Sequence, residues 1–252
     1  MNIIAPIAHN RRYRNAQNGI IRRYMAEPKG WSAHTERCKQ FIISALSDIK
    51  PQSVCIMGSG WLLDVPIDSL LLQCQRVVLM DIVHPKQIVH QHGHNPKISF
   101  VSTDLTGLAP YLNATPRKQL NYNNVCKQVE VNSIDTQPYD MVVSLNLLSQ
   151  LPEGIIERLR KHLSLSDSQT IDLSQRIQQA HITQLPKDKS LLISDIEEEF
   201  YDEQHRLVGS TPSVFVNLPQ SPHTQRWDWV FDTHYAYRED CHTTLKVQAI
   251  RM

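Results

Sequence analysis

Glycine, paired cysteines and long apolar runs are scarce or missing in this chain of 252 residues. Eight residues are glycine, about 3% where ~7% is usual, so each glycine position is informative. No apolar run approaches the roughly 18 residues that a membrane span needs. The apolar part of residues 1–14 is too short, and wrongly placed, for a secretory signal. The sequence predicts no membrane association.

The five cysteines are odd in number, widely spaced and never arranged as C-x-x-C. Most lie among apolar residues, which is typical of small buried side chains in a reducing compartment. Composition excludes collagen-like, coiled-coil and disordered chains. The length suits one large α/β domain or two small ones. We therefore expect a soluble cytoplasmic protein.

Charge is balanced in total but not along the chain. The formal net charge is +1, yet residues 1–40 carry eight basic and two acidic side chains, which leaves +6 there and −5 on the other 212 residues. A basic arm can contact phosphates, but no regularly spaced stacking aromatics accompany it. Nucleic-acid binding is therefore not indicated, and a solvated helical cap over an acidic body is the other interpretation.

Short apolar runs alternate with helical segments from residue 34 onwards. Apolar residues between His34 and Leu46 recur at the spacing of one helix face. Further helices are expected to open at Pro66 and to cover 85–92, 152–163 and 169–184, whereas the polar residues 110–137 predict an irregular or partly helical connection. Strands are expected at 53–57, 76–80, 98–102, 139–144, 190–194, 227–231 and 245–250.

This alternation predicts a parallel sheet with right-handed crossovers. The last two strands have no room for a helix between them, so they must lie antiparallel. The predicted fold class is therefore α/β, with a doubly wound, mostly parallel seven-stranded sheet and an antiparallel C-terminal hairpin.

The exit of the first expected strand carries two of the few glycines. Gly58-Ser59-Gly60 lets the backbone turn sharply and approach a ligand, because no Cβ intervenes at the glycines. The second strand ends at Asp81, where a carboxylate can accept hydrogen bonds from a ribose diol. Asp104 ends the third strand and either faces a ligand or caps the following turn. Together, the loop and the spacing to Asp81 indicate a cofactor site.

At these residues the chain resembles the class I S-adenosylmethionine-dependent methyltransferases. VCIMGSGWLLDVP is similar to their glycine loop, VVLMDIVHP to their second-strand end, ISFVSTDL to their third-strand element and YDMVVSLNLLSQLP to their fourth strand and following turn. LLISDIEEEF resembles their fifth strand, and the terminal hairpin their last two strands. The resemblance covers about residues 34–252 and implies a Rossmann-like domain there, with 1–33 as a basic helical N-terminal cap.

The resemblance also implies S-adenosyl-L-methionine as the cofactor. It assigns the methionine part to the glycine loop, the ribose hydroxyls to the second-strand end, the adenine to the third-strand end and the sulfonium to the fourth-strand exit. In that order, the implied cofactor-binding residues are Gly58, Ser59 and Gly60; Asp81 and Ile82; Asp104 and Leu105; and Asn146 and Leu147.

Two positions depart from the family pattern. The acidic residue that usually stands two positions before the first glycine is Ile56 here, which leaves open what holds the ammonium group of the cofactor. The third glycine is replaced by Leu62, which predicts an altered path into the next helix. Asp64 and Pro66 predict an extra irregular turn before that helix begins.

Catalytic residues are less well indicated than the cofactor loop. Methyl transfer can rest on alignment because the sulfonium is already activated, and a base helps only for a hydroxyl or a charged amine. His34, at the start of the first amphipathic helix, and Asn146 are weak candidates, and each also has a structural interpretation as a helix-start or turn residue. Tyr13 and Trp31 are candidates for a lid over the pocket.

No metal ligand is assigned. His90, His92 and His94 alternate, but Gly93 and Pro96 beside them predict a surface loop.

We expect an S-adenosylmethionine-dependent methyltransferase that acts on a small-molecule acceptor. One alternative is a non-catalytic module on the same fold that binds a cofactor or a partner. Another is an NAD-dependent oxidoreductase, although its glycine pattern would need glycine where Leu63 stands, and a bulky residue there obstructs a pyrophosphate. The acceptor and the oligomeric state do not follow from the sequence.

Overall fold

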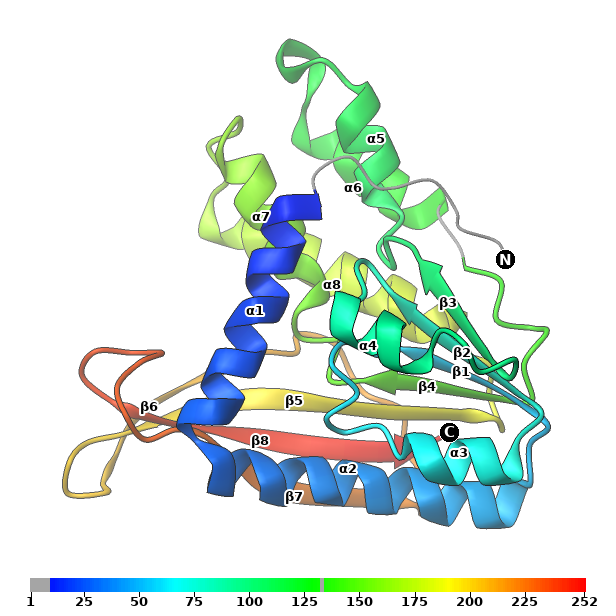
Figure 1. Ribbon diagram of the computed structural model, residues 1–252. Coiled ribbons are helices and arrows are strands. Elements are labelled where there is room, and N and C mark those ends of the chain that lie inside the picture. Colours follow the sequence, from blue (N-terminus) through cyan, green and yellow to red (C-terminus); the bar gives the residue numbers. More distant parts are fainter. Residues whose placement is uncertain (1–9, 132–133) are drawn as a thin grey trace.

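Five parallel strands form the centre of the molecule, which the computed structural model describes over residues 10–131 and 134–252 (Figure 1). They lie in the order β3-β2-β1-β4-β5. The chain therefore builds the sheet outward from β1, first through β2 and β3 on one side and then through β4 and β5 on the other. Strands β1 and β4 are almost entirely buried, as expected for strands covered by helices on both faces. Their bounds are β1 Ser53–Met57, β2 Arg76–Asp81, β3 Ile98–Ser102, β4 Met141–Leu145 and β5 Ser190–Tyr201.

The sheet continues with antiparallel strands, which confirms the predicted terminal pair. β8 (His242–Arg251) lies between β5 and β7 (Thr224–Asp232) and runs antiparallel to both. The sheet has eight strands rather than the predicted seven. The additional strand, β6 (Leu207–Pro212), pairs with the second half of β5. Nearly all of its residues are exposed, so it lacks the apolar alternation that indicates a half-buried strand.

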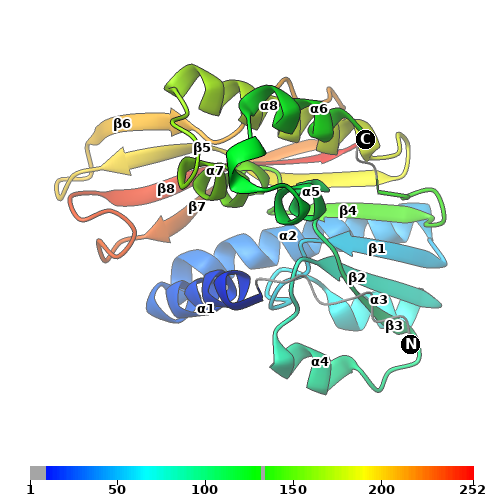
Figure 2. The ribbon, with the colours of Figure 1, turned by 90° about the horizontal axis from the view of Figure 1, so that it is seen from above.

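Helices cover both faces of the sheet (Figure 2). The first face packs against α2 (Pro28–Ile49), α3 (Ile67–Gln73) and α4 (Lys86–His92). The second packs against α5 (Leu108–Ala114), α6 (Tyr122–Val131), α7 (Leu151–Arg160) and α8 (Asp167–Gln184), and η1 (Arg117–Gln119) joins α5 to α6. The segment predicted as irregular or partly helical, residues 110–137, therefore contains most of α5 and all of α6. Residues 132–133, which follow α6, lie outside the described residues.

The N-terminal helix α1 (Asn10–Ala26) stands across the carboxyl ends of the parallel strands, joined to α2 through Glu27 (Figure 1). The carboxylate of Glu27 accepts hydrogen bonds from the backbone N–H and the hydroxyl of Thr233 in the loop after β7. Residues 1–9 of the predicted cap lie outside the described residues. Residues 28–33, also assigned to the cap, form the start of α2, with Pro28 in its first turn. The boundary at residue 33 stays a prediction.

Helix α2 approaches β7 so closely that one position requires glycine. A Cβ added to Gly30 would lie 2.2 Å from the carbonyl oxygen of Val230. We expect Gly30→Ala to lower the free energy of unfolding by about 2 kcal/mol, because the clash with backbone outweighs the better helix propensity of alanine. Chemical denaturation measures this. The matched control is Gly19→Ala in α1, where the nearest atom is 3.9 Å away and alanine should not destabilise; equal effects of the two changes would contradict the prediction.

No helix in the described part of the chain has the length and apolar character to cross a membrane. All five cysteines are free, and four of them are buried, as the sequence predicts.

Candidate functional site

A cavity of about 610 Å³ opens at the carboxyl ends of β1 and β4. Strand order reverses between these two strands, which is where open α/β sheets bind ligands, and the volume lies in the usual range for ligand pockets. The catalytic candidate His34 lines this cavity. So do all of the predicted cofactor-binding residues: Gly58, Ser59, Gly60, Asp81, Ile82, Asp104, Leu105, Asn146 and Leu147. The structure brings them together, and their role in cofactor binding stays a prediction.

The glycine loop lies against the exit of β4. Gly58 has a φ of 81°, and an added Cβ would lie 2.6 Å from the carbonyl oxygen of Leu145. Gly60 also has a positive φ, of 41°. Side chains at these positions would be strained or would collide with backbone, so this tight turn explains both glycines.

Leu62 adopts the conformation that the third glycine of the family pattern would favour. Its φ is 56°, in the left-handed region, and its side chain is buried in the core beneath α2. A non-glycine residue there carries strain on the order of 1–2 kcal/mol. Helix α3 begins at Ile67, after an irregular segment that includes Asp64 and Pro66. The predicted irregular turn is therefore present.

Asp81 connects the glycine loop to the end of β2. Its Oδ2 accepts a hydrogen bond from the backbone N–H of Gly60 at 2.8 Å, and its Oδ1 accepts one from Ile82 at 2.7 Å. Each carboxylate oxygen keeps a further lone pair. Burial raises the pKa of Asp81, whereas the Gly60 N–H and the neighbouring His84 lower it. Asp81 can therefore hold the loop and still accept hydrogen bonds from a ligand.

Asp104 has the capping role that the sequence left as one of two interpretations. Its Oδ1 accepts hydrogen bonds from the backbone N–H and the hydroxyl of Thr106, and its Oδ2 accepts one from the N–H of Ala109 at 2.6 Å. These contacts hold the turn into α5. Asp104 also lines the cavity, so the capping contacts fix that part of the wall.

Asn146 directly follows β4 and adopts the left-handed conformation, with a φ of 46°. Asparagine tolerates this region better than most residues, and its backbone N–H donates to the carbonyl of Ile193. The side-chain Nδ2 donates to Oδ2 of Asp64 at 2.6 Å and lies 2.9 Å from Nε2 of His34. The structure thus places Asn146 between a carboxylate and an imidazole.

His34 is held as a neutral, immobile ring. It is buried and stacks on Trp229, with the ring centroids 3.7 Å apart. The indole Nε1–H of Trp227 donates to its Nδ1 at 3.1 Å. Burial lowers the pKa of His34 to about 3. A general base near neutral pH needs a higher pKa, so the structural interpretation of this catalytic candidate is the better one.

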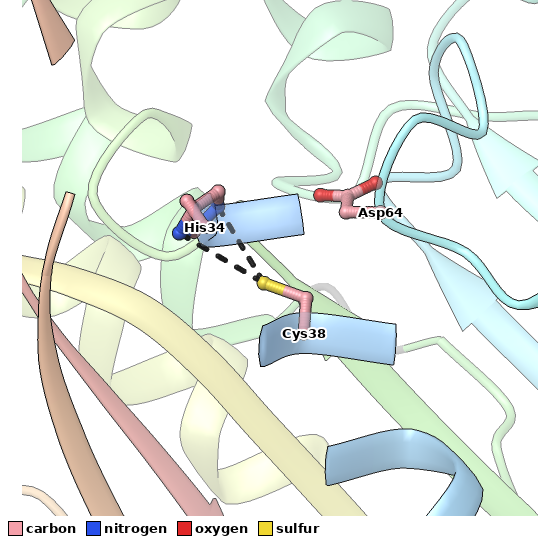
Figure 3. Close-up of side chains that lie close together, drawn as sticks. All are labelled: His34, Cys38 and Asp64. Atoms are coloured by element: carbon pink, nitrogen blue, oxygen red, sulfur yellow. Dashed lines mark hydrogen bonds between the residues drawn. The ribbon is translucent and has the colours of Figure 1, made fainter. Parts of the chain in front are cut away.

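His34, Cys38 and Asp64 converge closely enough to suggest a metal site (Figure 3). His34 and Cys38 come from successive turns of α2, and Asp64 comes from the loop after β1. A histidine that binds a metal normally donates its second ring N–H to an acceptor. Nδ1 of His34 instead faces the indole of Trp227, which can only donate. This donor set therefore does not suit a metal ion.

The far end of the cavity carries four carboxylates that the sequence analysis missed: Glu153 and Glu157 of α7, and Asp195 and Glu198 of β5. A β-bulge shifts the register of β5 between Asp195 and Glu197. Asp195 therefore pairs with Val247 and Glu198 with Leu245, which lie two positions apart on one face of β8. Without the bulge, residues three apart would face opposite sides.

These carboxylates differ in how they are held. Asp195 is buried and accepts a hydrogen bond from the Ser149 hydroxyl at 2.6 Å, and Glu198 accepts one from the Tyr237 hydroxyl at 2.9 Å. Glu153 is open to the cavity. Partial removal of its carboxyl group from water, together with the charges of Asp195 and Glu198, raises the pKa of Glu153 to about 7. Such a group can take up and release a proton near neutral pH.

Helix α1 covers the cavity between its two ends. Tyr13 lines the cavity near Gly154 of α7, and the indole of Trp61 donates to the carbonyl of Gln17 at 2.8 Å. Trp31, the second predicted lid residue, is instead packed in the core, where its Nε1 donates to the carbonyl of Phe231. Trp31 belongs to α2 and packs on Trp229 and Phe231 of β7, so it forms part of the fixed wall of the cavity instead of a lid.

Comparison with known proteins gives matches only among solved structures. No family model matches the chain, and no curated protein matches it. The N-methyltransferase NodS from Bradyrhizobium japonicum WM9, in complex with S-adenosyl-L-homocysteine, is 14% identical over 84% of this chain and 85% of that one, with a TM-score of 0.37. The Burkholderia thailandensis 1,6-didemethyltoxoflavin-N1-methyltransferase is 14% identical over 100% of this chain and 93% of that one, with a TM-score of 0.41.

The topology decides the fold. Five parallel strands are followed by an antiparallel pair in which β8 lies between β5 and β7, and the cavity lies at the switch point. The chain has a Rossmann-like, doubly wound α/β fold with an antiparallel C-terminal extension.

The cavity of this fold has two chemically different ends. The glycine loop, Asp81 and Asn146 form one end, at β1, β2 and β4. Glu153, Glu198 and the ring of Tyr237 form the other, between α7 and the extended part of β5. A single cavity with two such ends can hold two ligands side by side.

Proposed function

We propose that this chain is an S-adenosylmethionine-dependent methyltransferase with a small-molecule acceptor. The observation that carries the proposal is the hydrogen bond from the Gly60 N–H to Asp81, which fixes the glycine loop beside a strand-end carboxylate at the switch point. The predicted cofactor residues surround the same cavity.

The residues present fit such a cofactor. Ser59 is only 1% exposed, and its hydroxyl lies at the cavity wall with no hydrogen-bond partner, so it can bond to a ligand. Gly58 and Gly60 would pack against the methionine part, Asp81 would accept hydrogen bonds from the ribose hydroxyls, and Leu105 would lie at the adenine. When bound, the cofactor would supply an activated methyl group.

The chain's own residues would align the acceptor and receive its proton. Asn146 and Leu147 would line the floor at the junction of the two ends. Glu153 would accept the proton that an amine or hydroxyl acceptor loses, because the raised pKa of its carboxyl suits that transfer near neutral pH. Helix α1 would limit the access of water from above.

Calorimetry with S-adenosylmethionine and S-adenosylhomocysteine tests the proposal. We expect both to bind the wild type at one site per chain, and methyl label to pass to small amines or alcohols in a panel assay. NADH is the control ligand, because Leu63 obstructs the approach of a pyrophosphate. Binding of NADH alone would favour the oxidoreductase alternative, and cofactor binding without transfer to any acceptor would favour the non-catalytic module.

A further inference from the structure

Asp64 places a carboxylate that forms no ion pair, although the charge of Lys39 lowers its pKa, beside the glycine loop in the cavity wall. Its Oδ2 accepts a hydrogen bond from Nδ2 of Asn146 at 2.6 Å. Over the described ranges, no lysine or arginine forms an ion pair with it. Burial raises the pKa of Asp64. A carboxylate in such a place is costly unless a ligand supplies the opposite charge.

Two unpartnered hydrogen-bond acceptors line the same part of the cavity. Oδ1 of Asn146 and the hydroxyl of Ser59 are both buried and have no partner. Their backbones are adjacent, because the glycine loop lies against the exit of β4: a Cβ on Gly58 would lie 2.6 Å from the carbonyl of Leu145 and 3.3 Å from Cβ of Leu147. This wall therefore contains one carboxylate and two further acceptors that no described protein group satisfies.

A primary ammonium group complements this wall. It carries one positive charge and three N–H donors, and it accepts no hydrogen bond. The position at which the family pattern usually places an acidic residue is Ile56, which is fully buried in β1 and has no charge to offer. Asp64 comes from the irregular segment before α3, which Leu62 in its left-handed conformation leads into.

We propose that Asp64 binds the α-ammonium group of the cofactor's methionine part, with Asn146 and Ser59 as the accompanying acceptors. This inference rests on the proposed function, because it assigns a residue within the same site. It moves the charge that recognises the ammonium group from the end of β1 to the segment after the glycine loop.

The test compares two ligands on the full chain. S-adenosylhomocysteine carries the ammonium group, whereas 5′-methylthioadenosine shares the adenine and ribose but lacks the amino-acid part. By calorimetry, we expect Asp64→Asn to weaken S-adenosylhomocysteine at least tenfold and to change 5′-methylthioadenosine less than twofold. We also expect the ligand-free variant to melt at the same temperature as the wild type or higher, because it removes a partly buried carboxylate that forms no ion pair. Asp68→Asn, in the first turn of α3, is the matched control and should change neither affinity.

Several outcomes would overturn the assignment. Equal S-adenosylhomocysteine affinity in wild type and Asp64→Asn overturns the assignment of Asp64 but not the proposed function. An equal loss of affinity for both ligands also overturns the assignment, because it indicates a structural role for Asp64. If Asp64→Asn does not fold, Asp64→Ser is measured in the same way, with the same expectation. A Co²⁺ thiolate absorption band in the wild type that disappears in the Asp64 variant would assign the carboxylate to a metal ion. A wild type that binds neither ligand overturns the proposed function, and this inference with it.

Discussion

Asp81→Ala is expected to weaken S-adenosylmethionine binding about 100-fold, equivalent to about 3 kcal/mol. The change removes a charged acceptor of ligand hydrogen bonds, each worth ~1.5–3 kcal/mol. It also leaves the N–H groups of Gly60 and Ile82 without their partner, so the glycine loop loses its connection to β2. Calorimetry measures the affinity, and denaturation measures an accompanying loss of about 1–3 kcal/mol in the free energy of unfolding.

Asp48→Ala is the control for the Asp81 variant. Asp48 lies near the end of α2 and pairs with Arg251 at 2.6 Å, outside the cavity. Its loss should leave cofactor affinity unchanged. An Asp81→Ala variant that binds the cofactor as tightly as the wild type would contradict both the role of Asp81 and the proposed function.

Glu153→Gln is expected to lower kcat about 100-fold, the lower range for loss of a general base. In the wild type, kcat/KM should rise with pH and level off above about 7, where Glu153 has lost its proton. The variant should lose this pH dependence and keep its affinity for S-adenosylhomocysteine. Initial rates between pH 5.5 and 9 give the profile.

Stability gives a second measurement of the same group. The pKa of Glu153 is raised from 4.5 to about 7, so the folded chain holds a proton that the unfolded chain releases earlier. The wild type should therefore lose stability relative to Glu153→Gln as the pH rises through that interval. Glu36→Gln is the control, because Glu36 lies exposed on α2, outside the cavity. A wild-type rate that stays flat across pH 7 would contradict the assignment of Glu153.

The glycine-loop end of the cavity could be predicted from local sequence because its determinants are local. Apolar strands, two glycines at a strand exit and a carboxylate at the next strand end are each visible in a few consecutive residues. The choice between two roles for Asp104 needed the structure. The turn conformation that brings the N–H groups of Thr106 and Ala109 to its carboxylate does not follow from the sequence. His34 had a helical signal, but its two tryptophan neighbours come from β7, far along the chain.

The end of the cavity that carries Glu153, Asp195 and Glu198 could not be predicted in the same way. Asp195 and Glu198 share a face only because of a bulge, and period-two alternation assigns them to opposite faces. Glu153 follows Pro152 at a helix start, where an acidic residue is common for the helix dipole alone. Strand β6 had no apolar signal, and Leu62 gives no sign in sequence of its positive φ.

The bulge in β5 also bears on how such a protein can diverge. It lies beyond Ile193, the last residue of β5 that pairs with β4. Because Ile196 is the residue without a partner on β8, its deletion would leave Asp195 and Glu198 two positions apart, on the same face and opposite the same residues of β8. The bulge therefore lets this part of β5 lose one residue while its carboxylates keep facing the cavity.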